Sequence, residues 1–386
     1  MSCPHAQDWD PLSTAVVHDQ RGAGDAMREQ CPVAFSDLMG WSLFRHADLV
    51  RVLNEPEKFS SVVSRNLSVP NGMDPPKHGQ YRAVIERYFT PQAIHALEPQ
   101  CCSIATELVH SLRGRGELEL MNDFAHPFAV RVQCAFLGWP ANMHEPLRLW
   151  VQKNHAATLA QDRPAMADLA REFSGYVLGL LQSHRSAPNP GEGDVLASLT
   201  RQQVNGQSLS DDEITSILRN WTVGEISTIA SAIGIVAQYF AQHTDVQQLV
   251  RKQPAVLPEA IEEILRLYGP LLANRRVTTR AVEIGGRSIG AGERISLNWV
   301  AANRDGRAFS DANAFRLDRD ARANLLYGAG IHVCPGAPLA RMELRVAAQA
   351  LLDGSTAINP IAQRAPTHAV FPASGFASLP LQLAFA

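Results

Sequence analysis

The sequence lacks a clear excess of charge of either sign. It has 35 Lys and Arg residues against 38 Asp and Glu residues, which gives a formal net charge of −3. Binding to nucleic acid or to an anionic membrane surface depends on a basic face, so this balance offers no electrostatic case for either partner. We expect a protein that acts on small molecules.

Cysteines are few and scattered, and the N-terminus lacks an apolar run. The six cysteines form no spaced framework, and the adjacent Cys101 and Cys102 are poor partners for one another. We therefore expect free thiols and a reducing, cytoplasmic location. Residues Met1–Asp10 hold no apolar stretch, so we expect neither a signal peptide nor a membrane anchor. The only stretch with the composition of a linker is Ser186–Asp194, expected to be a surface loop.

Apolar periodicity predicts a mainly α-helical chain with small β-sheets. The hydrophobic fraction of 46% allows a large core, and length alone favours two domains. Helical patterns cover Gln92–Arg113, Phe124–Leu137, Ala165–Ser183, Asp211–Gln242, Val256–Leu267 and Pro338–Leu352. Strand patterns cover Ala34–Asp37, Trp41–Phe44, Val282–Ile284, Arg287–Ile289, Arg294–Leu297 and Leu379–Phe385.

The longest predicted helix is Asp211–Gln242. Ser210 and Glu213 form a capping-box pattern at its start. About 30 residues at 1.5 Å each give a rod of roughly 45 Å, long enough to cross a domain. Apolar residues occur almost all round it, so we expect a buried helix.

A glycine-rich loop ends in a single cysteine directly before the last predicted helix. Its sequence, Tyr327–Arg341, reads YGAGIHVCPGAPLAR. Glycine lets a flat ligand approach the backbone, and a cysteine at a helix N-terminus meets free amide groups that favour thiolate. Such a cysteine suits an axial ligand of haem iron. A zinc site would need further ligands that the sequence does not offer near His332, and a structural buried cysteine would leave the clustered glycines unexplained.

This loop resembles the haem-binding signature of cytochromes P450, aromatic-Gly-x-Gly-x-His-x-Cys-x-Gly-x-x-Leu-Ala-Arg. Every fixed position is met, with Tyr327 where phenylalanine is usual. The resemblance extends from about Arg45 to the end. It implies the P450 fold, a soluble bacterial type, and one domain over residues 1–386 with a lead-in of about residues 1–15. It also implies haem b (heme b, iron protoporphyrin IX) ligated by Cys334, with further cofactor contacts from Tyr327, Gly328, His332 and Gly336.

The same resemblance suggests which residues hold the haem propionates. His78 and Arg82 lie four residues apart, hence on one helical face, where two donors directed at a carboxylate make physical sense. Arg276 falls at the family's third propionate contact. The family often has a histidine where this chain has Asn324, whose amide can still donate.

Glu263 and Arg266 match the E-x-x-R element of the family. They lie three residues apart on a predicted helix, where a charge-assisted pair can form. In the family this pair is structural and is joined by an arginine of a later meander. Arg304 is near that region, but the sequence does not identify the partner.

The central helix departs from the family pattern Ala-Gly-x-Asp/Glu-Thr-Thr, whose acid and alcohol help to deliver protons during oxygen activation. The aligned stretch places Gly224 where backbone leaves room for oxygen, Ser227 at the threonine site and Ile226 at the acid site. Glu225 lies about 100° away around the helix and would serve only if a π-bulge distorts it. Three readings stay open: a displaced relay of Glu225 with Ser227 or Thr228, protons from water and substrate, or a structural role for Glu225.

By family alignment, the substrate pocket takes residues from several segments. Arg219 and Asn220, one turn before Val223, could reach a polar substrate group, although solvent or helix packing explains them equally well. The Val69–Gly72 loop is expected to close one side. The expected lining residues are Thr222, Val223, Ser227, Ala273, Asn274, Phe371 and Phe376.

The resemblance implies a monooxygenase that inserts one oxygen atom from O2 into a C–H bond. Arg219–Glu225 is similar to bacterial P450s that O-demethylate methoxylated lignin-type aromatics, which is the leading substrate expectation. The alternatives are hydroxylation of a terpenoid or another small molecule, a peroxide-driven oxygenase, and a non-catalytic haem-thiolate sensor. The chain has no flavin or dinucleotide motif, so we expect separate electron-transfer proteins: a ferredoxin with its reductase, or a fused flavin/iron–sulfur reductase.

Overall fold

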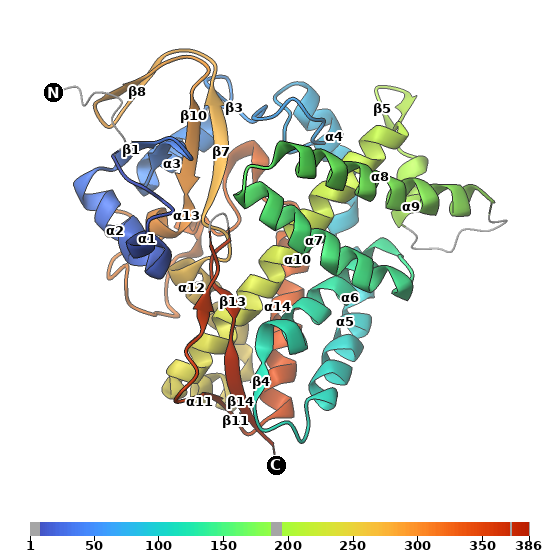
Figure 1. The fold of residues 1–386 in the computed structure, drawn as a ribbon, viewed down its shortest axis with the longest axis vertical. Coiled ribbons are helices and arrows are strands. Elements are labelled where there is room, and N and C mark those ends of the chain that lie inside the picture. The colour runs from blue at the N-terminus through green and yellow to red at the C-terminus, as the bar shows by residue number, and fades with distance from the viewer. Residues whose placement is uncertain (1–7, 187–194, 371–372, 386) are drawn as a thin grey trace.

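The computed structural model describes residues 8–186, 195–370 and 373–385. Three predictions fall wholly or partly outside these ranges: the N-terminal segment before residue 8, most of the predicted loop Ser186–Asp194, and the pocket residue Phe371. Helices dominate, with the largest sheet toward the upper left of the view and smaller groups of strands at the upper right and at the bottom (Figure 1). The expectation of a mainly α chain with small β-sheets is confirmed.

Helix α10 (Asp211–Gln242) is the central element, and it follows the predicted bounds. The capping box is present, because the Ser210 side chain accepts from the Glu213 amide and the Glu213 side chain accepts from the Ser210 amide. It crosses the middle of the molecule (Figure 1). It is long and apolar enough to span a membrane by composition, but 72% of that apolar window is buried inside the protein, as in a core helix.

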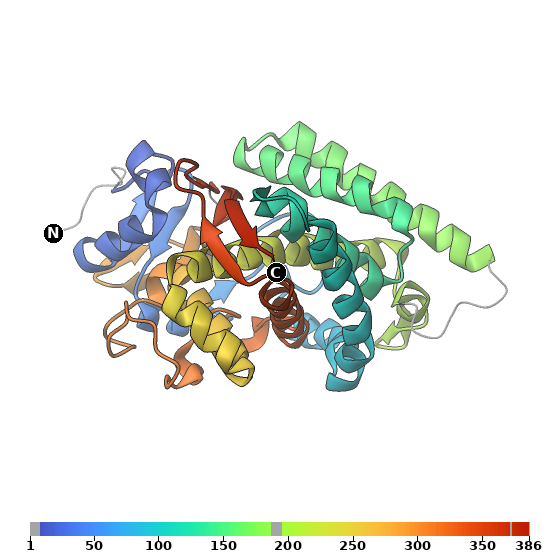
Figure 2. The ribbon, with the colours of Figure 1, turned by 90° about the horizontal axis from the view of Figure 1, so that it is seen from below.

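Four further helices form the main core with α10. These are α5 (Pro91–Ser111), α6 (His126–Leu137), α12 (Leu257–Tyr268) and α14 (Ala337–Gly354). Three of them pack against α10, and α5 packs against α6 and α14. Helix α14 packs against both α5 and α10. A short π-helical turn, Met121–Ala125, leads into α6. Seen from below, α7 and α8 (green) lie on the side opposite the N-terminal helices and strands (blue) (Figure 2).

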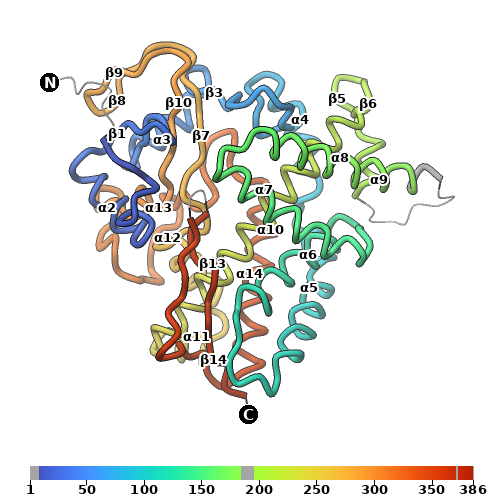
Figure 3. The backbone as a smooth tube through the Cα atoms, in the orientation of Figure 1, coloured from blue at the N-terminus to red at the C-terminus, as the bar shows by residue number. Residues whose placement is uncertain are grey.

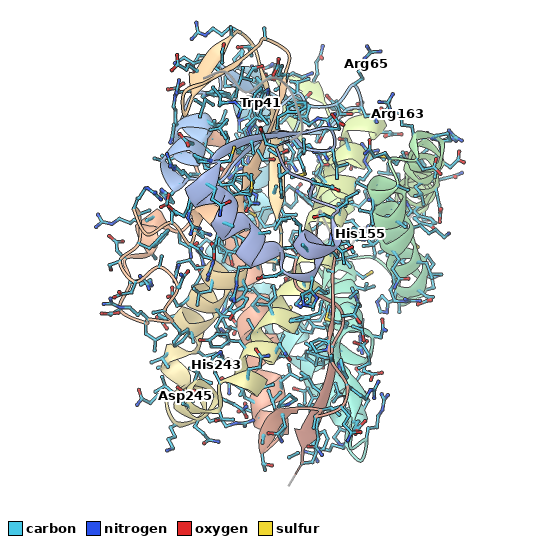
Figure 4. All side chains as sticks on the ribbon, turned by 60° about the vertical axis from the view of Figure 1, so that its left-hand side comes forward. Trp41, Arg65, His155, Arg163, His243 and Asp245 are labelled. Atoms are coloured by element: carbon cyan, nitrogen blue, oxygen red, sulfur yellow. The ribbon has the colours of Figure 1, made fainter. Side chains whose placement is uncertain are left out.

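The largest sheet has five strands in the order β1-β2-β10-β7-β3. Its members are β1 (Val33–Ser36), β2 (Gly40–Leu43), β3 (Phe59–Ser60), β7 (Ala273–Thr278) and β10 (Arg294–Asn298). Strands β2 and β10 pair in parallel although they are far apart in the sequence, as the chain trace shows (Figure 3). Trp41 of β2 lies at the opposite end of the molecule from His243 and Asp245, which mark the join of α10 and α11 (Figure 4).

The remaining elements are short or peripheral. The other helices are α1 (Thr14–His18), α2 (Gln20–Gln30), α3 (His46–Asn54), α4 (Lys77–Ile85), α7 (His144–Leu159), α8 (Arg163–Ser186), α9 (Val195–Thr200), α11 (Thr244–Lys252) and α13 (Trp299–Ala302). The other strands are β4 (Leu118–Glu119), β5 (Gln203–Val204), β6 (Gln207–Ser208), β8 (Val282–Ile284), β9 (Arg287–Ile289), β11 (Ala357–Pro360), β12 (Thr367–His368), β13 (Phe376–Ser378) and β14 (Pro380–Ala384).

The predicted long helices are all present, with ends that differ by about two residues. Sequence analysis missed α7, whose apolar positions are interrupted by His144, Lys153 and His155, and β7, whose residues Asn274–Arg276 are polar. Burial in β7 alternates only partly, so the strand is held by pairing with β10 rather than by a strong pattern of its own.

Candidate active site

The cysteine loop is a tight backbone structure immediately before α14. The Cys334 amide donates to the Tyr327 carbonyl at 2.8 Å, which closes the loop. Gly328 and Gly330 have φ angles of +72° and +68°. At Gly330 a Cβ atom would lie 2.2 Å from the Leu53 carbonyl oxygen of α3. Glycine is therefore required there both by conformation and by the close approach of α3.

The Cys334 side chain is exposed to the cavity that it lines. The surrounding protein raises the pKa of its thiol by desolvation, and the amides of Gly336 and Ala337 oppose that rise by hydrogen bonding to the sulfur. The amides at the helix N-terminus thus favour the thiolate. A bound metal would favour it further, because coordination by a metal deprotonates a thiol.

A cavity of about 320 Å³ lies between α10 and the cysteine loop. Aromatic side chains pack on the cysteine side of it, where Phe89 lies 3.6 Å from the position of a Gly336 Cβ and stacks on Phe136. The loop residues that line the cavity are Tyr327, Gly328, His332, Cys334, Pro335 and Gly336, and the α10 residues are Asn220, Trp221, Gly224, Glu225, Thr228, Ile229 and Ala232.

Cationic and donor groups gather at one edge of this cavity. Arg82 and Arg276 line it, and Arg276 is 9% exposed with its guanidinium bonded to the Arg275 carbonyl. The rings of His78 and His332 lie 4.1 Å apart, and within the described residues neither Nε2 atom has a partner. Burial, followed by the neighbouring cationic groups, lowers the pKa of His332 to about 3, and burial also lowers that of His78.

These features fit haem. Two arginines and two buried histidine nitrogens without partners form a donor set that suits the two propionates. The loop glycines let a flat ring approach, and Cys334 supplies an axial ligand. The predicted contacts His78, Arg82, Arg276, Tyr327, Gly328, His332, Cys334 and Gly336 are thus brought together: all but His78 line the cavity, and His78 packs against His332.

Asn324 does not join them, contrary to the expectation. Its Oδ1 accepts from the Leu326 amide at 2.9 Å, and the residue is not among those that line the cavity. Asparagine side chains commonly close turns in this way. The Asn324 side chain therefore closes its own turn, and the groups left to bind the propionates are the arginines and histidines.

Helix α10 presents Gly224, Glu225 and Thr228 to the cavity. A Cβ at Gly224 would meet nothing within 4 Å, so this position opens onto free space. The Thr228 hydroxyl donates to the Gly224 carbonyl at 2.5 Å. Helix α10 stays α-helical throughout, so Glu225 reaches the cavity without a π-bulge.

The residues that line the cavity thus differ from the aligned positions, although Gly224, Glu225 and Thr228 were all among the predicted site residues. Ser227 and Val223 are absent from the lining, and Thr222 is completely buried with its hydroxyl lacking a partner in the described part of the chain. Because each residue turns the helix by about 100°, the acid and the alcohol that reach the cavity are Glu225 and Thr228, one residue to either side of the aligned Ile226 and Ser227. Ile226 is buried away from the cavity, so it does not stand where an acid is needed.

Glu225 meets a second acid that sequence analysis missed. Glu343 of α14 is completely buried, and neither of its carboxyl oxygens has a hydrogen-bond partner within the described residues. Burial raises the pKa of both carboxyls, and for Glu343 the charge of Glu225 raises it further. In the sequence, this acid could have been found as a glutamate on the apolar face of the helix that follows Cys334.

The segment 67–71 is tied to α10 over the cavity. Ser216 Oγ and Arg219 both donate to the Leu67 carbonyl, at 3.0 and 2.8 Å. The Asn220 amide donates to the Val69 carbonyl at 2.9 Å. Arg219 therefore holds this segment and does not line the cavity, whereas Asn220 both holds the segment and lines the cavity.

On the opposite side, Asn274 lines the cavity, whereas Ala273 is buried beside it and does not. Residues alternate between the two faces of β7, so only one of the two neighbours can face inward. The Asn274 Oδ1 accepts from the Trp299 indole at 3.3 Å.

The Glu263–Arg266 pair is buried and bidentate, with distances of 2.7 and 2.8 Å. Its meander partner is Arg319, whose Nε lies 2.7 Å from Glu263 Oε1. Arg304, which the sequence placed near this region, instead pairs with Asp25 of α2 at 2.7 Å. The network ties α12 to the segment 310–319 that precedes the cysteine loop.

A long buried helix over a cysteine loop, with cationic donors at the edge of the cavity between them, defines a haem-thiolate oxygenase site. The family model for cytochrome P450 matches residues 139–354. A cyclomarin C epoxidase of Salinispora arenicola is 33% identical over 85% of this chain and 86% of its own. A 6-deoxyerythronolide B hydroxylase of Saccharopolyspora erythraea is 32% identical over 80% of this chain and 74% of its own. The chain belongs to the cytochrome P450 family.

Solved structures of other cytochromes P450 share this fold. The cytochrome P450 CYP109Q5 of Chondromyces apiculatus covers 98% of both chains with a TM-score of 0.88 at 26% identity. The cytochrome P450 CYP109B1 of Bacillus subtilis covers 95% of this chain and all of its own with a TM-score of 0.83 at 27% identity. The protein is thus a P450 monooxygenase of the soluble bacterial type, a family that binds haem through a cysteine thiolate and acts on small organic molecules with O2 and redox partner proteins.

Proposed function

We propose that this P450 O-demethylates a small methoxylated aromatic compound in the cytoplasm. Residues 1–386 would form one P450 domain with a lead-in of about residues 1–15. Electrons would come from separate proteins, a ferredoxin and its reductase or a fused flavin/iron–sulfur reductase. Cys334 is the proposed haem ligand, and His78, Arg82, Arg276 and His332 hold the propionate edge.

Haem with a thiolate ligand supplies the activation of dioxygen and the transfer of one oxygen atom to a C–H bond. The protein's own residues bind, orient and supply protons. Gly224 leaves open space beside α10, and Thr228 presents a hydroxyl there. Glu225 brings a carboxyl to the same face, and burial raises its pKa, which favours the protonated form.

The inference that the substrate is small rests on one observation, the closed segment 67–71 over the cavity. Hydrogen bonds from Ser216, Arg219 and Asn220 hold it against α10. Pro70 and Asn71 of this segment then line the cavity, so this edge is closed by a stretch of chain that is held against α10. A compact, flat substrate suits the remaining room better than a long chain or a macrocycle.

The similarity of Arg219–Glu225 to P450s that demethylate lignin-type aromatics supports the same reaction. One oxygen atom enters a methyl C–H bond of Ar–OCH3, and the other leaves as water with two electrons and two protons. The resulting Ar–OCH2OH collapses to a phenol and formaldehyde. Asn71 and Asn274 are polar lining residues that could hold the ring oxygens.

The test is a screen of mono- and dimethoxybenzenes, vanillate-type acids and matched ethyl ethers. Binding is read from the low- to high-spin shift of the haem band, and turnover from formaldehyde released with reduced cofactor and redox proteins. Formaldehyde in equal amounts with phenol supports the proposal. Tight binding of bulky polycyclic or macrocyclic compounds, with no shift from any methoxyarene, would refute it.

A second candidate is hydroxylation of a larger natural product. The observation that favours it is that relatives sharing a third of their residues are named as an epoxidase of cyclomarin C and a hydroxylase of 6-deoxyerythronolide B. A terpenoid or other small molecule belongs to the same class of reaction. Including a macrolactone and a monoterpene in the screen separates this candidate from the first.

Two further alternatives depended on the isoleucine at the presumed acid site, a peroxide-driven oxygenase and a non-catalytic haem sensor. That isoleucine points away from the cavity and Glu225 points into it, which favours turnover with O2 and electrons. Product formed with hydrogen peroxide but not with redox proteins would support the peroxygenase. Substrate binding without product under either condition would support the sensor.

A further inference from the structure

An exposed apolar stretch lies beside the closed edge of the cavity. Val62, Val63 and Leu67 of this stretch are 51%, 44% and 39% exposed, and Val223 on α10 is 37% exposed. The Leu67 carbonyl accepts from Arg219, which lies one turn before Val223, so the stretch 62–67 and this part of α10 meet at Arg219. Large apolar side chains that gather on a surface mark a place where another molecule binds.

Arg219 carries a charge that no acid neutralises within the described residues. Its guanidinium donates to the Leu67 carbonyl, and burial lowers its pKa without any opposing charge. None of the residues three or four positions away on α10 is acidic, so the helix itself offers no ion pair. A partly buried cation without an anion is unfavourable, and the guanidinium keeps further N–H donors that an anion can use.

A second arginine belongs to the same stretch. Arg65 lies two residues before Leu67, and its exposed side chain is at the outer edge of the molecule (Figure 4). No carboxylate in the described part of the chain pairs with it. Arg65 and Arg219 therefore flank Leu67 with two positive charges, although the whole chain has a net charge of −3. A local positive field attracts anions and raises their rate of association.

We propose that Arg65, Arg219 and the apolar side chains around them form an entry site for the carboxylate of an aromatic acid. The carboxylate meets the two guanidinium groups, and the ring lies on Leu67 and Val223 before the substrate enters the cavity. Arg219 does not line the cavity, so it acts on the encounter and not on the reaction. This inference rests on the proposed function and narrows its substrate to methoxylated aromatic acids.

An aromatic acid fits this surface better than the other candidate substrates do. A neutral methoxyarene or a terpenoid would leave both positive charges without a partner, and a cationic compound would be repelled. Hydrogen bonds between arginine and a carboxylate are among the strong ones, and they are often bidentate. The guanidinium group also stacks on aromatic faces, which suits a flat ring.

The test compares para-methoxybenzoate with its methyl ester, which keeps the ring and the methoxy group but carries no charge. Association of each with the haem-loaded protein is followed by stopped-flow from the low- to high-spin shift, at low and at high salt. We expect the rate for the acid to fall as salt rises and the rate for the ester to stay constant, because salt screens exposed charges. An acid whose rate does not depend on salt, or the same dependence for both ligands, overturns the entry site.

Arg65→Gln is the variant that isolates charge, because Arg65 makes no hydrogen bond to segment 67–71. It should slow association of the acid roughly fivefold at low salt, the effect of one unit charge about 4 Å away in water, and leave the ester unchanged. Arg219→Gln should also slow the acid, and Arg219→Lys, which keeps the charge, should retain most of the wild-type rate. Arg113→Gln, at an exposed arginine that follows α5, is the control and should change neither ligand.

The outcomes separate this inference from the proposed function. If Arg219→Gln also alters the rate for the ester, segment 67–71 has loosened, and Arg65→Gln then decides the question. Unchanged rates for the acid in Arg65→Gln, or equal slowing of acid and ester, overturn the entry site, while formaldehyde released from the ester leaves the proposed function standing. If neither ligand shifts the haem band of the wild type, the proposed function fails and the entry site fails with it.

Discussion

The Thr228 hydroxyl donates to the Gly224 carbonyl one turn earlier in α10, at 2.5 Å, and both residues face the cavity. This bond fixes which alcohol of the helix belongs to the site. It also places Glu225, between them in sequence, on the same face.

Replacing Thr228 by Val should impair the use of electrons more than the binding of substrate. The hydroxyl is lost while the shape is kept, so protons reach the cavity less directly. We expect product formed per reduced cofactor consumed to fall roughly tenfold, within the range for a group that assists proton transfer. The ratio of product to hydrogen peroxide measures this.

Ser227→Ala is the matched control for that prediction. Ser227 is adjacent in sequence but does not line the cavity. We expect product yield within about twofold of wild type, as for substitutions away from the reacting groups. A large loss at Ser227 with none at Thr228 would return the site to the sequence-based alignment.

Glu263→Gln should destabilise the fold strongly. Its carboxylate accepts from Arg266 and Arg319, and Arg266 is 1% exposed, so neutralising it leaves buried positive charge unpaired. We expect a loss of about 3–5 kcal/mol in the free energy of unfolding. Urea titration of the haem-loaded protein measures it. Glu145→Gln, at a pair with a 62% exposed carboxylate, should change stability by less than about 1 kcal/mol.

Arg276→Leu should loosen the haem. The side chain is buried at the edge of the cavity with a carbonyl as its protein acceptor, so a propionate is its natural anionic partner. Losing a hydrogen bond to a charged group costs about 1.5–3 kcal/mol, which corresponds to faster haem transfer to apomyoglobin by about tenfold or more. The exposed Arg280→Leu should not alter that rate.

His126 makes the protein less stable in mild acid. Burial, followed by the charge of Arg148, lowers its pKa in the folded state, although Glu119 acts in the other direction. Because the unfolded chain binds this proton more readily, stability is complete above the unfolded value of about 6.5 and falls as the pH drops below it. His126→Gln should flatten the decline in unfolding free energy between about pH 7 and 5. His95→Gln, with an 89% exposed side chain, should not.

Patterns that act locally could be predicted from the sequence, and patterns that depend on tertiary packing could not. The capping box at Ser210 and Glu213 fixed the start of α10 correctly because both partners lie within one turn. The sequence could not show that Thr228 rather than Ser227 lines the cavity, because a motif without its usual acid does not fix which side chains face inward. Which alcohol lines the cavity depends on the direction in which each side chain leaves the helix.

Partners that lie far apart in the chain could not be predicted from the sequence either. Arg319 and Arg304 are equally plausible partners for Glu263 by spacing, and only the folded meander separates them. Glu343 gave little signal, since a single acid on an apolar helix face more often marks a surface. Its meeting with Glu225 depends on how α14 packs against α10.

The carbon-monoxide difference spectrum of the reduced protein is the most direct test of Cys334 as the haem ligand. We expect the strongly red-shifted haem band of a thiolate-ligated P450 in the wild type and in Cys134→Ser, because Cys134 is buried and does not line the cavity. Cys334→His should keep haem but lose that band. A wild type that binds haem without the band, or a Cys334→His variant that retains it, would contradict the assignment of Cys334.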